Sequence, residues 1–341
     1  MSKRIVICCD GTWNTRDQKS PTNVVRIHDA VLSTDADGRA QLPFYHQGVG
    51  TSGFWDRWLG GGFGLGLSHC VRDAYRFVVE HFEPGDELFF FGFSRGAYTA
   101  RSTVGFIHNC GVLRPEYVDK VDDAYAIYRD RKNAELSPSG DEAKRFRKAY
   151  SHEPRIRFVG VWDTVGSLGI PLSGLRLINL VNRRWQFHDV ELSRRVDAAF
   201  QALAIDERRG PFRPAVWTRH PEAGDQEIEQ VWFTGVHSDV GGGYPDRELA
   251  DISMAWMVER ARACGLAIDY GAVAPDPFGT LHDSMTMWYR LVQQAERTLD
   301  ATDPVQCLAL TAYKRHERLA QDYSPENLVE YLRADGPVRD V

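Results

Sequence analysis

A serine flanked by glycines is the first candidate for chemistry in this chain. Residues 92–96 read G-F-S-R-G and match the G-x-S-x-G pattern of a nucleophile elbow, where a serine sits on a tight turn between a strand and a helix. The apolar run Leu88 to Phe91 predicts the strand, and Ala97 to Ala100 can begin the helix. The sequence therefore predicts Ser94 as a nucleophile and the backbone amide of Arg95 as a donor to an oxyanion. An inert serine in a glycine-bracketed turn is the alternative.

Two histidines could serve as the general base that a serine hydroxyl needs. His237 is the better candidate, because it follows the predicted strand 231–234 and precedes the glycine run 241–243. His46 also follows a predicted strand, but it comes before the serine in the chain. The order in α/β-hydrolases is serine, acid, histidine, which favours His237. A histidine that only caps a turn by hydrogen bonding is the alternative.

Three aspartates compete for the role of the acid that orients the base. Asp163 leads, because it directly follows the strand predicted at 155–162 and lies between the serine and the histidine. Asp239 stands two residues from the histidine and could equally form a turn, and Asp206 lies in a polar run. The sequence leaves Asp239 and Asp206 open as alternatives.

The end of the first predicted strand adds a further group of candidates. The backbone amide of Gly11 or Thr12 could supply a second hydrogen bond to the oxyanion. A different chemistry is also open, because aspartate and histidine side chains can together hold a divalent metal for phosphoester hydrolysis. The side chains for that interpretation are Asp10, Asp163, His237 and Asp239. Their spacing matches no compact metal motif, so the sequence predicts neither a metal nor another cofactor.

Five segments together resemble one known family. They are Cys9 to Asn14 (CDGTWN), Gly48 to Thr51 (GVGT), Gly92 to Tyr98 (GFSRGAY), Val161 to Val165 (VWDTV) and Gly235 to Tyr244 (GVHSDVGGGY). The family, once called DUF2235, is that of the catalytic domain of type VI secretion phospholipase effectors of the Tle1-like kind. The resemblance extends from about residue 3 to about residue 265.

This resemblance implies an α/β-hydrolase fold, a catalytic triad and hydrolysis of phospholipid acyl esters. Carried over residue by residue, the triad is Ser94, Asp163 and His237. Lipid esters are therefore the expected substrates, with transient contact to a membrane surface. A soluble esterase acting on a smaller ester and a non-catalytic binding protein with a hydrolase fold are the alternatives.

The elements that must position these residues alternate along the chain. Strands are predicted at 4–9, 44–46, 87–91, 155–162 and 230–234, and helices at 67–80, 95–107, 115–129 and 248–264. This alternation predicts an α/β fold with a mostly parallel central sheet flanked by helices, whose ligands lie at the carboxyl ends of the strands. Residues 133–153 are expected to form a polar surface excursion. Residues 166–213 are expected to form a helical insertion, with a lid over the site as one interpretation.

Composition limits the remaining classes. The chain has 341 residues, 43% hydrophobic and 26% charged, which fits one globular domain over 1–341. A net charge of −6 gives no general attraction to nucleic acid. The six cysteines are scattered and follow no secretory segment, which favours buried thiols and a cytoplasmic protein, with signal-independent export left open. The sequence does not indicate which oligomeric state the protein has.

Overall fold

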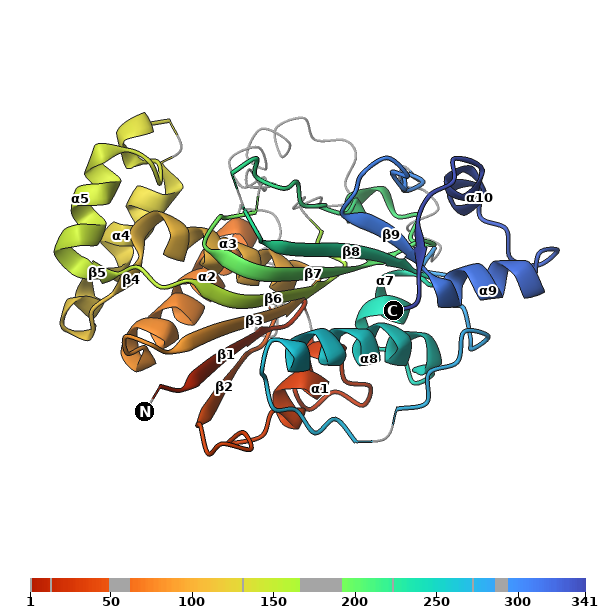
Figure 1. Cartoon of the computed structure of the whole chain (residues 1–341), viewed down its shortest axis with the longest axis horizontal. Helices are drawn as coiled ribbons and strands as arrows, with labels where there is room; N and C mark the ends of the chain where they lie inside the picture. Colours follow the sequence, from red (N-terminus) through yellow and green to blue (C-terminus); the bar gives the residue numbers. More distant parts are fainter. Residues whose placement is uncertain are drawn as a thin grey trace.

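A sheet of eight parallel strands organises the described chain (Figure 1). The computed structural model describes residues 2–12, 14–48, 62–130, 132–165, 192–222, 224–271, 273–285 and 294–341. The strands lie in the order β10-β9-β8-β7-β6-β3-β1-β2, and each adjacent pair is parallel. They are β1 (Arg4–Cys9), β2 (Gln41–His46), β3 (Glu87–Phe93), β6 (Ile156–Trp162), β7 (Val196–Ala204), β8 (Glu227–Phe233), β9 (Gln306–Ala309) and β10 (Val338–Arg339). The predicted α/β fold with a mostly parallel sheet is confirmed.

The central strands are apolar on both faces because helices cover both. In β1, Ile5 and Ile7 belong to one core cluster while Val6 and Cys8 belong to the other, and all four are fully buried. Successive side chains of a strand point to opposite faces, so burial on both sides gives a continuous apolar run in the sequence. The strand predicted at residues 4–9 is confirmed at both ends, because this continuous apolar run marks it in the sequence.

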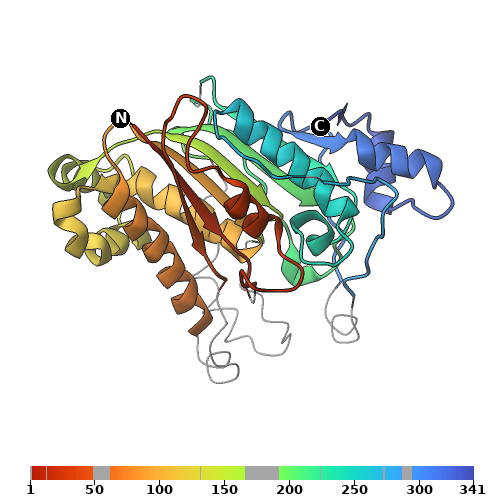
Figure 2. The same ribbon diagram turned by 90° about the horizontal axis from the view of Figure 1, so that it is seen from below.

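Helices form a separate layer on each face of the sheet. One layer contains α2 (Gly62–His81), α3 (Arg95–Cys110) and α4 (Val121–Arg129), and the other contains α1 (Asn23–Ala30) and α8 (Glu248–Ala263) (Figure 2). At one end of the molecule lie α9 (Leu310–Arg318) and α10 (Glu326–Arg333), beside β9. At the other end lie α5 (Asp141–Tyr150) and the antiparallel pair β4 (Val112–Leu113) and β5 (Ser151–His152) (Figure 1).

The direction of the strand order reverses between β1 and β3. The chain reaches β2 from β1 through α1 on one face, and then reaches β3 through α2 on the other face. In open parallel sheets, ligands bind beyond the carboxyl ends of the strands at such a switch point. Asp10 directly follows β1 and Ser94 directly follows β3, so both candidates lie at this position.

The prediction of a helical insertion at 166–213 is wrong over its second half. Val196–Ala204 forms β7, a strand of the central sheet between β6 and β8. Four of its nine residues are alanines and only Val196 is β-branched, so the segment has few of the residues that usually indicate a strand. Residues 166–191, on which the rest of the insertion and the lid interpretation depend, lie outside the described residues. The single domain over 1–341 stays a prediction.

The polar stretch 133–153 is more regular than the expected excursion. It contains the short 3₁₀ helix Ala134–Leu136 and α5, which buries Ala143 and Arg147 while its other charged side chains face solvent. Another 3₁₀ helix, Pro115–Lys120, leads into α4, and a third spans Gly210–Phe212. Within the described part of the chain, no helix combines the length and the apolar character needed to cross a bilayer.

Candidate active site

Ser94 lies on the turn between β3 and α3. Its backbone conformation is one that residues other than glycine rarely adopt. Its φ is 59° and its ψ is −120°. Two glycines let this turn lie tightly against neighbouring backbone. A Cβ on Gly96 would come within 2.1 Å of the carbonyl oxygen of Cys9, and a Cβ on Gly92 within 2.6 Å of Cα of Ala97. The G-x-S-x-G spacing is therefore required by the close approach of β1 and α3 to the turn.

Asp163 follows the neighbouring strand at the same level as the serine. Phe93 pairs with Trp162 in the register of β3 and β6, and the amide of Ser94 donates to the carbonyl of Trp162 at 3.0 Å. The parallel register thus brings the next residue, Asp163, beside the turn. Asp163 is fully buried and has a φ of 42°, so it too lies on a sharp turn at the end of its strand.

The carboxylate of Asp163 contacts the imidazole of His237. Nδ1 of the histidine lies 2.5 Å from Oδ2 of the aspartate. Because an ionised carboxylate can only accept, Nδ1 carries the proton and Nε2 keeps its electron pair. Nε2 is buried and has no hydrogen-bond partner among the described residues. It is therefore available to accept a proton.

Two aromatic rings enclose the imidazole of His237. The ring of Phe93, the residue before Ser94, lies 4.5 Å away, and the ring of Phe212 lies 4.9 Å away in an edge-on orientation. Burial lowers the pKa of His237 below its ordinary value, and the hydrogen bond to Asp163 offsets part of this effect. The imidazole is therefore neutral at neutral pH, as a general base must be.

Arg297 forms a buried ion pair with Asp163 that the sequence does not reveal. Nη1 lies 2.5 Å from Oδ1 and Nη2 lies 2.8 Å from Oδ2, and the two side chains are 2% and 0% exposed. Burial alone would raise the pKa of Asp163, but the charge of Arg297 and the hydrogen bond from His237 hold this pKa well below its ordinary value. Asp163 is therefore ionised at neutral pH despite its burial.

Glu207 bonds to the backbone of His237. It is not one of the residues that the sequence predicts for the site. Its Oε2 accepts from the amide of His237 at 3.2 Å, and its Oε1 accepts from the hydroxyl of Ser284 at 3.0 Å. Arg209 donates to both carboxylate oxygens, at 2.8 and 2.7 Å. Burial opposes ionisation, but Arg209 keeps the pKa of Glu207 below its ordinary value. A glutamate within a polar run carries no local signal of this role.

The loop after β1 reaches the turn from the other side. A Cβ on Gly11 would lie 3.2 Å from Cβ of Ser94, so the two backbones are close. The amide of Gly11, however, donates to Oδ1 of Asp10 at 2.7 Å. This engagement makes Thr12 the better of the two candidates for an oxyanion donor. Burial raises the pKa of Asp10, while hydrogen bonds to its carboxylate offset part of the rise.

The two rival acids hold turns near the histidine instead of bonding to its ring. Oδ1 of Asp239 lies 2.6 Å from Nδ1 of a second histidine, His282. Asp206 accepts from the amide of Gly235 at 2.7 Å. Burial raises the pKa of Asp239 and of Asp206. In the described chain, the acid that bonds to the ring of His237 is Asp163.

The rival base, His46, has a different environment. Its Nε2 lies 3.3 Å from a carboxylate oxygen of Asp73. Burial disfavours the charged form, but hydrogen bonds to Asp73 and Cys70 outweigh it and raise the pKa of His46 to about 10. A histidine that is protonated at neutral pH cannot accept a proton, so His46 is a poor candidate base.

The candidate metal ligands do not form one cluster. Asp163 contacts His237, whereas the carboxylates of Asp10 and Asp239 are engaged by other protein donors. Among the residues that the structure describes, no group of three or more His, Cys, Asp or Glu side chains is arranged to hold a metal ion. What the site does bring together is a hydroxyl on a tight turn, a neutral imidazole and an ionised carboxylate, the groups used in nucleophilic catalysis.

A protein-family model matches most of the chain. The family model described as "T6SS, Phospholipase effector Tle1-like, catalytic domain" matches residues 3–260. Among curated proteins, the uncharacterized protein YEL023C of Saccharomyces cerevisiae is 30% identical over 239 residues. The matched part covers 64% of this chain but only 33% of the yeast protein.

The matches among solved structures include two proteins of low sequence identity. An uncharacterized protein from Pseudomonas aeruginosa superimposes with a TM-score of 0.51 at 16% identity, covering 98% of this chain and 52% of that one. The Tle1 effector bound to the VgrG spike from the type 6 secretion system gives a TM-score of 0.41 at 19% identity, covering 72% of this chain and 52% of that one. The first of these similarities supports the fold alone.

Proposed function

The chain belongs to the family of Tle1-like catalytic domains of type VI secretion phospholipase effectors, and from this membership we propose that it is a serine hydrolase that cleaves acyl esters of lipids. Family membership implies hydrolase activity. The observation that carries the finer proposal is the contact between Asp163 and His237 beside the turn that bears Ser94. A buried carboxylate that holds an imidazole in one tautomer is the arrangement that activates a serine hydroxyl.

The first half of the proposed reaction forms an acyl-enzyme. Nε2 of His237 takes the proton of Ser94 as the hydroxyl oxygen attacks the ester carbonyl. The backbone amides of Arg95 and Thr12 donate to the oxyanion of the tetrahedral intermediate. Asp163 stays ionised and stabilises the imidazolium, which then gives its proton to the departing alcohol.

The second half returns the enzyme to its starting state. Water replaces the alcohol, and His237 takes a proton from it as the water oxygen attacks the acyl carbonyl. The intermediate then releases the fatty acid, and the imidazolium returns a proton to Ser94. Arg297 keeps its contact with Asp163 throughout, so the acid needs no proton of its own in either half.

Lipid esters are the substrate class that the family suggests, and contact with a membrane surface would follow from it. A small-ester esterase would use the same groups, so the chemistry of the site supports both. Activity on vesicles and on short soluble esters therefore has to be compared directly.

The experiment that tests the proposal is labelling with a fluorophosphonate probe, which reacts with activated serines. We would label four proteins in parallel: wild type, Ser94→Ala, His237→Ala and the control Ser102→Ala. Ser102 is a buried serine in α3, the helix that follows Ser94. The same proteins would be assayed for fatty acid release from phosphatidylcholine vesicles and for acid release from short esters. Labelling and hydrolysis are expected in wild type and Ser102→Ala only.

The outcomes separate the alternatives. Hydrolysis of short esters without any release from vesicles would assign the smaller substrate. Activity that survives Ser94→Ala and is lost with a chelator would favour the metal-dependent phosphoesterase. A wild-type protein that neither reacts with the probe nor hydrolyses an ester would contradict the proposal and favour a binding protein.

A further inference from the structure

A cavity of about 540 Å³ lies on the face of the sheet that α3 covers. Its walls come from α3, from α5, from the residues just before β7 and from the segment that leads into β8. Ser94, Asp163 and His237 are not among the described residues that line it. Its volume is within the range of sites that hold small organic ligands.

Positive charge dominates the described lining. Five side chains of the lining are cations, namely Arg101, Lys144, Arg147, Arg194 and Arg195, and no aspartate or glutamate accompanies them. They come from three separate parts of the chain, so this is not one helix face with a run of basic residues. Cations from several elements that converge on one cavity raise the potential inside it.

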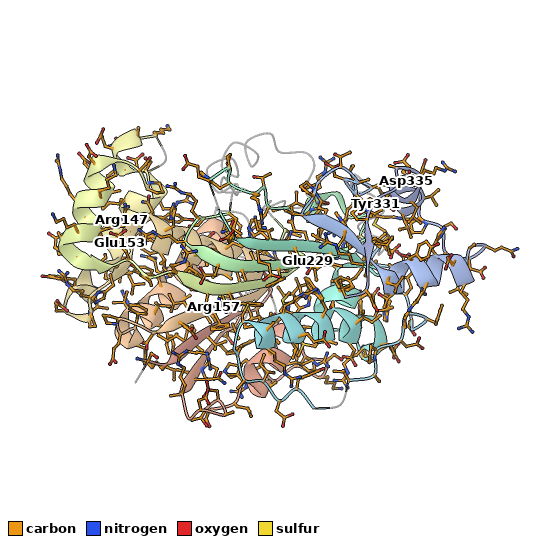
Figure 3. All side chains as sticks on the ribbon, viewed as in Figure 1. Arg147, Glu153, Arg157, Glu229, Tyr331 and Asp335 are labelled. Carbon is orange, nitrogen blue, oxygen red and sulfur yellow. The ribbon has the colours of Figure 1, made fainter. Side chains whose placement is uncertain are left out.

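Among the described residues, three carboxylates contact four of these five cations. Glu153 lies 3.1 Å from Nε of Arg147 and also contacts Arg195. Figure 3 labels Glu153 beside Arg147. Glu222 lies 2.6 Å from Arg194, and its side chain is 72% exposed. Asp141 lies 3.3 Å from Lys144 and is 69% exposed. The pairs of Lys144 and Arg194 are exposed, and exposed ion pairs are weak and easily exchanged for another anion.

The two buried arginines of the lining, Arg101 and Arg147, also donate to neutral groups. The guanidinium of Arg101 donates to Oε1 of Gln201 and to the carbonyl of Ala215, and it lies 4.5 Å from the ring of Trp217. Arg147 donates to the carbonyl of Asn109 at 2.7 Å. Such acceptors fix the orientation of a guanidinium group. The cavity is therefore preorganised for an anion.

His108, in the wall of the cavity, is affected by the same positive charges. Burial lowers the pKa of His108 to about 4, and the nearby charges of Arg195, Arg147 and Arg194 contribute to the shift. Its Nδ1 is buried and has no hydrogen-bond partner in the described chain. A buried ring nitrogen that faces several cations can bond to a ligand that carries an acidic hydroxyl or an additional donor.

From the cavity, its charge and its fixed arginines, we propose that this site binds a small phosphate-bearing ligand. Guanidinium groups match the geometry of phosphate oxygens, and several cations favour a ligand with more than one negative charge. The apolar wall, which includes Val104, Val159, Leu192 and Trp217, would pack against the organic part of a phosphate ester. The proposal does not depend on catalysis by Ser94.

The test measures binding of inorganic pyrophosphate by isothermal titration calorimetry. Lys144 and Arg194 are 55% and 50% exposed, so the double charge reversal K144E/R194E should leave the fold intact. The matched control is R16E/R155E, which reverses two cations that are 56% and 60% exposed and lie outside the cavity. Both doubles change the net charge equally, and K144Q/R194Q removes the two charges without reversing them.

We expect wild type to bind pyrophosphate, with binding at least about tenfold weaker in K144E/R194E and a smaller loss in K144Q/R194Q. Ser94→Ala and R16E/R155E should bind like wild type. Cosedimentation with phosphatidylcholine vesicles, with and without phosphatidic acid, distinguishes a lipid phosphate from a free one as the source. A wild type that binds neither probe overturns the proposal, and so does an equal loss in R16E/R155E. Loss of binding in Ser94→Ala would move the anion to the active site instead.

Discussion

The ring of Phe93 lies 4.5 Å from the imidazole of His237, so the residue just before the candidate nucleophile contacts the candidate base. A Cβ on Gly241, in the short helix α7 (His237–Gly241) that His237 begins, would come within 2.0 Å of the Phe93 ring. The ring is therefore fixed between β3 and α7, and it excludes water from one face of the imidazole. The pH dependence of the reaction should follow from this enclosure.

The rate of fluorophosphonate labelling should depend on the neutral fraction of His237. Burial disfavours the imidazolium and lowers the pKa of His237 below the ordinary value of 6.5. The base therefore stays neutral as the pH falls to 6.5, and the rate should decline only at lower pH. Labelling rates measured across the acid range give the midpoint directly. A midpoint above 6.5 would contradict the enclosure as the dominant effect.

Replacing Glu207 with glutamine should move this midpoint to lower pH. The negative charge of Glu207 raises the pKa of His237, and the positive charge of Arg209 lowers it. The glutamine would keep the shape of the side chain but leave the charge of Arg209 unopposed. The control is Glu222→Gln, which removes a 72% exposed carboxylate elsewhere and should leave the midpoint unchanged. An unchanged midpoint in Glu207→Gln would limit that residue to a structural role.

Asp163→Asn should reduce the labelling rate by about four orders of magnitude, because an amide no longer selects the tautomer that leaves Nε2 free. Asp206→Asn is the matched control. Asp206 is half-buried and also bonds near the histidine, but it contacts the Gly235 amide and not the ring. We expect the control to lose stability while labelling stays within about tenfold of wild type. Equal losses of labelling would return Asp206 to the list of acids.

Arg297→Met should lower the free energy of unfolding by about 3–5 kcal/mol, because the Asp163 carboxylate would be left buried and unpaired. Denaturant unfolding measures this loss. Arg16→Met breaks an ion pair whose arginine is 56% exposed and should cost about 0–1 kcal/mol. Adding Asp163→Asn to Arg297→Met should recover part of the stability, since it removes the unpaired charge. No recovery would show that Arg297 acts through packing alone.

Ser94→Gly should be more stable than Ser94→Ala by about 1 kcal/mol, although neither can react with the probe. The serine has a φ of 59°, which strains any residue with a Cβ and suits glycine. Thermal and denaturant unfolding of the two variants would measure the difference. Equal stabilities would mean that the turn is relaxed in spite of its φ.

Much of the sheet could be predicted, because its central strands are buried on both faces. The run at Leu88 to Phe91 is apolar throughout and lies in β3, and the helix expected at 248–264 ends one residue from the observed end of α8. β7 was not predicted, because it contains four alanines and only one β-branched residue. β9 is too short for a periodic signal, with four residues. Its place at the sheet depends on pairing with β8, which the local sequence cannot show.

Some residues of the candidate site could be predicted from the sequence and others could not. Ser94, Asp163 and His237 each follow a strand, and parallel strands bring their carboxyl ends to one edge, so alternation alone predicts that they meet. Arg297 has no such marker. It is one of 41 lysines and arginines, and only the folded chain shows that its charge opposes a buried carboxylate. The engagement of the Gly11 amide by Asp10 is likewise a matter of loop geometry.

Asp163 and Arg297 are 134 residues apart in the chain, and the family match already ends at residue 260. During translation, the serine, the acid and the histidine are therefore all made before the arginine that neutralises the acid. A nascent chain that stops short of Arg297 has to leave this carboxylate hydrated or protonated, because burying it as an unpaired charge costs several kcal/mol. Its histidine then lacks a fixed tautomer. The ribosome thus produces all three candidate catalytic side chains well before it produces the arginine that pairs with the acid.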